Sequence, residues 1–343
     1  MHSMGGTMKK LLFAAAAYTL STGASCAQPA GVNFAGKTIS LYIGNSIGGG
    51  YDLYGRAIAR HLSKHIPGSP AILPKNMEGG GSLRAANFMA SVAPRDGTAI
   101  ATIGRGTAFA TLMGQKGAAF DATTLSWLGS ANEETSVCAA WHTSGVKSMS
   151  DLKTRDLVIG STLATDDASQ LPKLLNGLFG TRFKLVLGYP GGNEMNMAME
   201  RGETQGRCGL SWGSFNATHP EWVTNKLVTP LFQVALSRSP DLPEAPLLLD
   251  MATNEEQRMM IKSFAVRQAM GRPFFAPPDL PEATLNMLRQ AFDATMADRE
   301  FRADAEKSGL EINPVKGARV AELVSEIYRT PPEVVRRMIE MSN

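Results

Sequence analysis

The stretch Gly44-Asn45-Ser46-Ile47-Gly48-Gly49-Gly50-Tyr51-Asp52 follows the apolar run Ile39–Ile43 and precedes a segment with helical spacing. A second turn of this kind, Gly188-Tyr189-Pro190-Gly191-Gly192-Asn193, follows the apolar run Phe183–Leu187. A strand that turns through glycines into a helix exposes backbone N–H groups at the positive end of the helix dipole, where an anion is stabilised. Each turn alone is also compatible with an ordinary strand–helix connection that binds nothing. Two of them, about one domain apart, predict two lobes that close on one small anion.

Strand-like and helical segments alternate around these turns. The expected strands lie at 38–43, 71–74, 99–103, 157–160, 184–187 and 204–210, with an extended stretch at 127–140. This alternation predicts an α/β fold in which parallel sheets are covered by helices on both faces. We expect a discontinuous first domain at 34–140 plus 236–343, with a second domain inserted at 141–235.

The N-terminus has the pattern of an export signal. Met8-Lys9-Lys10 is a basic start, residues 11–20 are apolar, and Ser25-Cys26-Ala27 is a small-residue cleavage site. We expect cleavage after Ala27, so that residues 1–27 form a signal peptide and the mature protein lies in the periplasm. Lipidation of Cys26 is the alternative, but Gly23 stands where a lipobox normally has an aliphatic residue.

Charge and composition exclude several classes of partner. The 343 residues are 43% hydrophobic and 19% charged, and the formal net charge is +3. Removal of residues 1–27 takes away Lys9 and Lys10 and no acidic residue, which leaves +1. A nearly neutral chain without a basic face interleaved with aromatics does not predict nucleic-acid binding. No later apolar run approaches the roughly 20 residues needed to span a bilayer.

Cys138 and Cys208 are the two cysteines that remain after cleavage, and both lie in apolar, strand-like runs. In an oxidising compartment they could form a disulfide, and two separately buried thiols are the alternative. Two cysteines without clustered histidines do not predict a metal site. We expect no cofactor.

Gly209-Leu210-Ser211-Trp212-Gly213 matches the G-x-S-x-G nucleophile elbow of serine hydrolases. An α/β-hydrolase needs an acid and then a histidine after the nucleophile. The only downstream histidine is His219, and no Asp or Glu lies between it and Ser211. A secreted hydrolase that uses Ser211 therefore remains an alternative, but the sequence favours a non-catalytic protein.

Arg105 in Gly104-Arg105-Gly106-Thr107 follows an expected strand, at the edge of the sheet where ligands of open α/β sheets bind. Its guanidinium could hold a ligand carboxylate through two parallel hydrogen bonds, or it could be a solvated surface group. The pair Asp166-Asp167 could cap the following helix or accept hydrogen bonds from a ligand.

Several motifs together resemble a known family. They are Ile43–Asp52 with Arg56, Asn76-Met77-Glu78-Gly79-Gly80-Gly81-Ser82, Ala93-Pro94-Arg95-Asp96-Gly97-Thr98, Gly188-Tyr189-Pro190-Gly191-Gly192 and Phe275-Ala276-Pro277-Pro278. In this order and spacing, from about Lys37 to Ile339, the chain resembles the periplasmic solute receptors of tripartite tricarboxylate transporters, the Bug-type receptors. The resemblance implies a monomer with a two-lobed, type II periplasmic-binding-protein fold. It also implies a di- or tricarboxylate, acidic amino acid or aromatic acid as ligand and membrane permease subunits as partners, with a ligand sensor for a two-component system as the alternative.

The resemblance also implies which residues contact the ligand. In the first lobe they are Ser46, Gly48, Gly49, Asp52, Gly104, Arg105 and Thr107. In the second lobe they are Ser161, Thr162, Tyr189, Gly191 and Gly192. Arg105 and Trp212 stand where we expect smaller residues in the family, so they are the expected source of this receptor's own selectivity.

Overall fold

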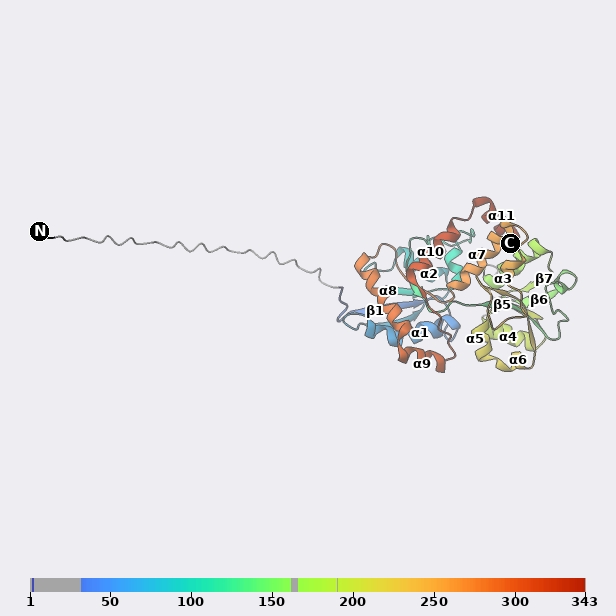
Figure 1. The fold of residues 1–343 in the computed structure, drawn as a ribbon, viewed down its shortest axis with the longest axis horizontal. Helices are drawn as coiled ribbons and strands as arrows, with labels where there is room; N and C mark the ends of the chain where they lie inside the picture. Colours follow the sequence, from blue (N-terminus) through green and yellow to red (C-terminus); the bar gives the residue numbers. More distant parts are fainter. Residues whose placement is uncertain (1, 3–31, 162–165, 190, 343) are drawn as a thin grey trace. The chain divides into compact units, whose positions relative to one another are not determined.

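Two β-sheets organise the chain, and each carries helices on both faces (Figure 1). The computed structural model describes residue 2 and residues 32–161, 166–189 and 191–342. The expected signal peptide, its cleavage site and Cys26 lie outside the described residues. From Val32 to Asn343 the chain forms one compact unit. None of the helices in the described part combines the length and apolar character needed to cross a membrane.

The first sheet has the strand order β11-β4-β10-β3-β1-β2. Its strands are β1 (Thr38–Ile43), β2 (Ala71–Asn76), β3 (Ala99–Thr102), β4 (Ser126–Ser130), β10 (Pro273–Ala276) and β11 (Val315–Lys316). Strand β1 runs parallel to β2 and β3, and β10 runs antiparallel to β3 and β4. Helices α1 (Gly50–Leu62), α8 (Glu282–Ala297) and α9 (Arg299–Lys307) cover one face, and α2 (Leu83–Ser91) and α10 (Gly317–Tyr328) cover the other.

The second sheet has the order β7-β6-β8-β5-β9. Its strands are β5 (Ser136–Trp141), β6 (Leu157–Gly160), β7 (Phe183–Val186), β8 (Gly206–Ser211) and β9 (Val228–Val234). Strand β6 is parallel to β7 and β8, whereas β5 is antiparallel to β8 and β9. Helices α3 (Asp167–Phe179), α7 (Glu255–Ala269) and α11 (Pro332–Ser342) pack on one face, and α4 (Gly192–Glu200), α5 (Trp212–Thr218) and α6 (Pro220–Thr224) lie on the other.

The α/β prediction is confirmed, but the sheets are mixed rather than purely parallel. Each antiparallel pair includes β4, β5 or β10, which are strands that border the two crossovers. The first crossover is residues 131–135, and the second is residues 235–272. Both join a strand of one sheet to a strand of the other.

The expected boundary at 141 differs from the observed topology. The extended stretch at 127–140 breaks into β4 in the first sheet and β5 in the second, so residues 136–141 belong with the second sheet. The C-terminal part also contributes to both lobes, because Phe264 of α7 and Met338 of α11 share a core with Ile159 of β6. The physical reason is that α7 and α11 bury their apolar residues against α3 and the second sheet.

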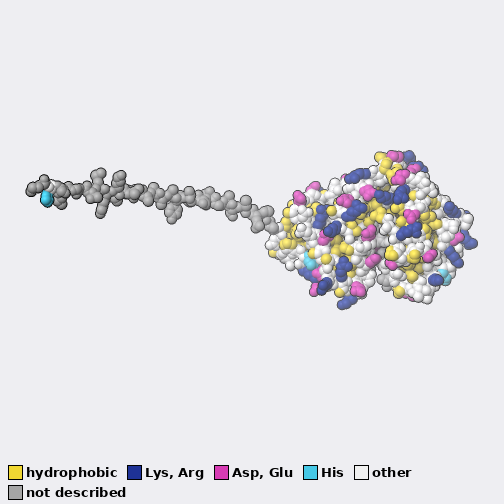
Figure 2. All heavy atoms as spheres, viewed as in Figure 1, with side chains coloured by type: hydrophobic (Ala, Val, Ile, Leu, Met, Phe, Trp, Pro, Cys, Tyr) yellow, Lys and Arg dark blue, Asp and Glu magenta, His cyan; other side chains and the backbone are white. Residues whose placement is uncertain are grey.

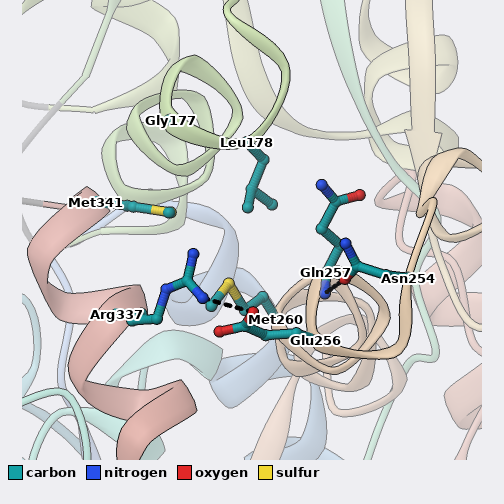
Figure 3. A pocket seen from close by; sticks show the side chains of 8 residues that line it. All are labelled: Gly177, Leu178, Asn254, Glu256, Gln257, Met260, Arg337 and Met341. Carbon is teal, nitrogen blue, oxygen red and sulfur yellow. Dashed lines mark hydrogen bonds and ion pairs between the residues drawn. The ribbon is translucent and has the colours of Figure 1, made fainter.

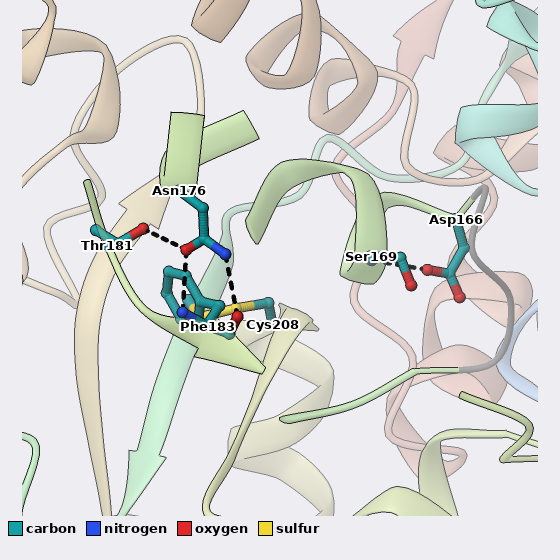
Figure 4. Close-up of a disulfide and its surroundings, with 7 residues drawn as sticks. Asp166, Ser169, Asn176, Thr181, Phe183 and Cys208 are labelled. Carbon is teal, nitrogen blue, oxygen red and sulfur yellow. Dashed lines mark hydrogen bonds between the residues drawn. A yellow bond between two sulfur atoms is a disulfide. The ribbon is translucent and has the colours of Figure 1, made fainter. Parts of the chain in front are cut away.

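A disulfide joins Cys138 of β5 to Cys208 of β8 inside the core of the second lobe (Figure 4). The two strands are antiparallel neighbours, so the bond links adjacent strands. Beside it, the amide of Asn176 at the end of α3 donates to the Phe183 carbonyl (3.0 Å) and accepts from Thr181 Oγ1 (2.8 Å). These bonds fix the end of α3 to the start of β7.

Charged side chains of both signs are interspersed on the face of the molecule seen in Figure 2. This distribution agrees with the small net charge of the sequence. A surface with mixed charge supports solubility but attracts no polyanion.

Candidate functional site

The first glycine turn leads from β1 into α1 and is held in shape by Asp52. The Asp52 carboxylate accepts hydrogen bonds from the Gly48 N–H, from Arg56 Nε and from Asn76 Nδ2, each at 2.9 Å. Burial alone would raise the pKa of Asp52, but these donors hold the pKa below its ordinary value. The oxygens of Asp52 thus bond the protein's own donors and set the course of the chain into the helix.

Helix α1 begins without a side-chain cap. Its N-cap residue is Gly49, whose N–H donates to the Ser46 carbonyl (3.3 Å), and no side chain of the described residues caps this end. Gly48 has φ = +79°, a backbone conformation that favours glycine. The first N–H groups of a helix have no intrahelical acceptor and favour an anion, and Asp52 already places one carboxylate in this turn.

The segment after β3 places Gly104, Arg105 and Thr107 beside this turn. It forms the short 3₁₀ helix η2 (Arg105–Phe109), and the Arg105 N–H donates to Tyr51 Oη of α1 (2.9 Å). Thr107 Oγ1 donates to the Gly81 carbonyl (2.7 Å). Residues expected from two different motifs therefore meet at the carboxyl end of the first sheet.

Arg105 is buried rather than solvated, with 8% of the residue exposed. It forms ion pairs with Glu134 of the first crossover and with Asp167 of α3, the latter at 3.2 Å from Nε to Oδ2. The sequence leaves open whether Arg105 holds a ligand or is a solvated surface group. The second alternative is wrong, because the residue lies between the two lobes. Its guanidinium contacts the protein's own carboxylates.

Arg105 belongs to an interlobe ion network that consists of Arg105, Glu134, Asp167, Arg267 and Arg272. Arg267 Nη1 lies 2.6 Å from Asp167 Oδ1, and Arg272 Nη1 lies 2.7 Å from Glu134 Oε1. Both lobes and both crossovers contribute residues to the network. Three arginines against two carboxylates give it a formal charge of +1.

The network favours the ionised forms of Asp167, Arg105 and Arg272. Burial would raise the pKa of Asp167, but the charges of Arg267 and Arg105 lower it below its ordinary value. Burial would likewise lower the pKa of Arg105 and Arg272, but Glu134 raises both. Because each charge is compensated by a neighbour, the network can exist where water has little access.

The second glycine turn leads from β7 into α4. The Tyr189 N–H donates to the Ser161 carbonyl (3.3 Å), and Ser161 Oγ donates to Asp166 Oδ1 (2.7 Å). Asp166 also caps α3 by accepting from the Ser169 N–H (2.9 Å), so the prediction of a helix cap is confirmed for this residue. Thr162 and Pro190 lie outside the described residues.

Helix α4 also begins at glycines, and an arginine lies against its first turn. Gly191 is the N-cap and makes no side-chain cap bond with the described residues. Arg207 Nη1 of β8 donates to the Gly192 carbonyl (3.1 Å) and to Asn196 Oδ1 (2.9 Å). A Cβ atom at Gly192 would approach Arg207 Nη2 to 2.8 Å, so a side chain here would force the guanidinium to shift.

Arg207 did not appear among the residues expected from the sequence. The available signal is the single charged residue within the strand-like run 204–210. Burial lowers the pKa of Arg207 to about 10, opposed by Asp166 and reinforced by the positive charge of Arg105. Arg105 bonds Tyr51 of the first turn and pairs with Asp167, and the charges of Arg105 and Asp166 both act on Arg207 beside the second turn.

Trp212 lies beside a cavity of about 300 Å³ that is lined by both crossovers and both lobes. Its indole Nε1 is buried and has no hydrogen-bond partner among the described residues. Glu134 of the ion network and Glu311 of the first lobe also line the cavity, and burial raises the pKa of Glu311. Trp212 therefore lies near the ion network, at a cavity that it shares with the carboxylates of Glu134 and Glu311.

A second hollow, of about 240 Å³, lies between helices α3, α7 and α11 (Figure 3). None of the residues expected from the sequence lines it. Its two charged side chains, Arg337 and Glu256, form an ion pair with each other at 2.6 Å. We therefore place the candidate site between the lobes and not here.

The nucleophile-elbow interpretation gains no support from the surroundings of His219. Ser211 is the N-cap of α5, a helix of seven residues. The His219 ring lies against Phe215, with ring centroids 5.5 Å apart, and its Nδ1 bonds Thr218 Oγ1 at 2.8 Å. These contacts place the histidine in an aromatic cluster with Phe215 and Trp222.

No protein-family model and no curated protein sequence matches the chain. Solved structures do match over most of its length. A TctC solute-binding protein from Polaromonas superimposes with a TM-score of 0.65 at 14% identity, over 88% of this chain and 98% of that one. The periplasmic binding protein BugD gives 0.65 at 16% identity, over 89% and 97%. MatC from Rhodopseudomonas palustris, with bound malate, gives 0.63 at 18% identity, over 89% and 99%.

Such low identities establish the fold and leave the ligand open. The matches cover both lobes and nearly the full length of each matching protein. This chain therefore has the two-lobed α/β fold of the TctC- and Bug-type periplasmic solute-binding proteins.

Proposed function

We propose that this protein is a non-catalytic periplasmic receptor that captures a small organic carboxylate between its two lobes. The observation that carries the proposal is that a buried arginine lies beside the start of each helix that follows a glycine turn: the Arg105 N–H bonds Tyr51 of α1, and Arg207 Nη1 bonds the Gly192 carbonyl of α4. Arginines gather in the same region, and the ion network that holds three of them has a net positive charge. Both features stabilise an anion.

The energies involved require contacts from both lobes. One helix N-terminus stabilises an anion by roughly 0.3–1 kcal/mol, and by about 2 kcal/mol when partly buried. Micromolar affinity corresponds to about 8 kcal/mol. Hydrogen bonds to charged groups contribute about 1.5–3 kcal/mol each, so several of them from both lobes must act together. Binding then favours the closed arrangement, because only closure brings both sets of donors to the ligand.

We further propose that the receptor delivers its ligand to permease subunits of a tripartite tricarboxylate-type transporter. The fold shared with TctC and BugD supports this assignment. The malate bound to MatC, a protein of the same fold, supports a carboxylate as ligand. We also propose that the ligand contacts the residues that the family resemblance implies, among them Ser46, Thr107 and Gly191. Trp212 is proposed to contribute to selectivity.

A thermal-shift panel tests the proposal. The mature protein is heated with malate, citrate, adipate or benzoate, and with 1,6-hexanediol as an uncharged match for adipate. We expect at least one acid to raise Tm in a concentration-dependent way, since a ligand that binds the folded state stabilises it by mass action. The diol should leave Tm unchanged. Absence of a shift with every acid at millimolar concentration, supported by calorimetry, would overturn the carboxylate receptor.

A further inference from the structure

Arg207 differs from the other arginines between the lobes in what it bonds. Arg105, Arg267 and Arg272 each lie within ion-pair distance of Glu134 or Asp167. Among the described residues, no carboxylate lies within ion-pair distance of Arg207. Its two acceptors, the Gly192 carbonyl and Asn196 Oδ1, are neutral and share the single donor atom Nη1.

The bonding pattern leaves one edge of the guanidinium available. Nε is buried and has no hydrogen-bond partner among the described residues. Nη2 makes no hydrogen bond to them either. Nε and Nη2 form the side-on edge of an arginine, whose two parallel N–H groups match the two oxygens of a carboxylate. A buried donor without a partner in a native structure requires an explanation, and a bound anion provides one.

The surroundings of this edge also suit an anion. The first turn of α4 lies against the guanidinium, its N-cap Gly191 makes no side-chain cap bond with the described residues, and the one carboxylate in this turn is that of Glu194 near Gly191. Burial and the positive charge of Arg105 lower the pKa of Arg207 to about 10, opposed by Asp166. A carboxylate at the side-on edge would restore the balance of charge.

We infer that Arg207 holds a carboxylate group of the ligand through Nε and Nη2, and that it is the main anionic anchor of the second lobe. This inference rests on the proposed function. It assigns the carboxylate to Arg207 rather than to Arg105, because a ligand at Arg105 would have to displace Glu134 or Asp167. At Arg207, none of the described carboxylates lies within ion-pair distance, although the charge of Asp166 acts on it from farther away.

The test compares dissociation constants for Arg207→Gln, Arg207→Lys and the wild type by calorimetry, with malate, citrate, adipate and benzoate as probes. Arg201→Gln is the matched control, since Arg201 lies at the C-terminal end of α4, is 67% exposed and has Nη1 4.0 Å from Glu203 Oε1. We expect Arg207→Gln to weaken the acids that bind the wild type by roughly 10- to 100-fold. The dissociation constant of Arg207→Lys should lie between those of the wild type and Arg207→Gln, because lysine keeps the positive charge but lacks the two parallel N–H groups of the guanidinium. Arg201→Gln should bind like the wild type.

Gly192→Ala provides a second variant that leaves the arginine in place. Its methyl group would meet Arg207 Nη2 at 2.8 Å and Cζ at 3.3 Å, so the guanidinium must move from its position. We expect binding to weaken by at least several-fold without loss of the folded state. This variant removes no charge, so its effect reports on the geometry at the start of α4, which sets both the position of the guanidinium and the approach of the ligand to residue 192.

Stability measurements separate a binding arginine from a structural one. Because Arg207 is underpaired, ligand-free Arg207→Gln should melt at the wild-type Tm or above it. Unchanged dissociation constants in Arg207→Gln, or a large drop in Tm with unchanged affinity, would overturn the inference while the receptor assignment stands. If the wild type binds none of the four acids, the proposed function fails and the inference fails with it.

Discussion

Arg105 Nε lies 3.2 Å from Asp167 Oδ2, and this ion pair connects the carboxyl end of the first sheet to the first turn of α3 on the second. Asp167 binds Arg267 on its other oxygen at 2.6 Å. One carboxylate therefore joins the two lobes and one of the segments that cross between them. This geometry makes Asp167 the residue on which the arrangement of the network depends.

Replacement of Asp167 by Asn should destabilise the protein. The change leaves Arg105 and Arg267 buried with one carboxylate fewer between them, and breaking a buried ion pair costs about 3–5 kcal/mol. Urea denaturation measures the free energy of unfolding. Asp250→Asn is the control, because its ion pair with Arg238 is more than half exposed on both sides and such pairs contribute about 0–1 kcal/mol. Equal losses in the two variants would contradict a buried, coupled role for Asp167.

Acid should remove the contribution of the Asp167 carboxylate to the free energy of unfolding. The pKa of Asp167 is lowered on folding from its ordinary value of 3.8, so its stabilising effect is fully present above that value. The effect is lost as the pH falls through the lower pKa of the folded state. The difference in unfolding free energy between the wild type and Asp167→Asn should therefore be constant from pH 7 to about pH 5 and shrink below about pH 4. Other lowered groups such as Asp52 titrate equally in both proteins and cancel in the difference. A gap that stays constant down to pH 3 would argue against the pairing.

The parts of the fold that could be predicted from the sequence are those set by local patterns. The apolar run at 38–43 predicts β1 with its observed bounds, because a buried parallel strand is a short apolar run bounded by turns. Residues 157–160 predict β6 equally well. The pattern of the extended stretch at 127–140 does not separate β4 from β5, although the polar group Asn132-Glu133-Glu134 marks the break. Assignment of β5 to the other sheet depends on long-range pairing that a local pattern does not contain.

The site was predictable only in part for the same reason. The position of Arg105 at a strand end follows from its sequence context, but its partners Glu134 and Asp167 are distant in the chain and are brought to it by both lobes. Arg207 looks like an irregularity in a strand until α4 is placed against it. The alternation of β8, which buries Cys208 and Leu210, does indicate that Arg207 points to the opposite face.

Loss of the Cys138–Cys208 disulfide should lower stability without changing the fold. The bond links residues 70 apart in sequence, and the chain-entropy account gives roughly 4 kcal/mol for a loop of this length. We expect Cys138→Ala/Cys208→Ala to unfold at a clearly lower urea concentration than the oxidised wild type. Reductant should lower the urea midpoint of the wild type toward that of the variant. It should leave the midpoint of the variant unchanged, so the variant serves as the control for reductant. Mass spectrometry of alkylated, unreduced periplasmic protein should find neither thiol modified. Two alkylated thiols, or a midpoint insensitive to both reductant and mutation, would mean that the two neighbouring strands of the second sheet are held together by packing and hydrogen bonds alone.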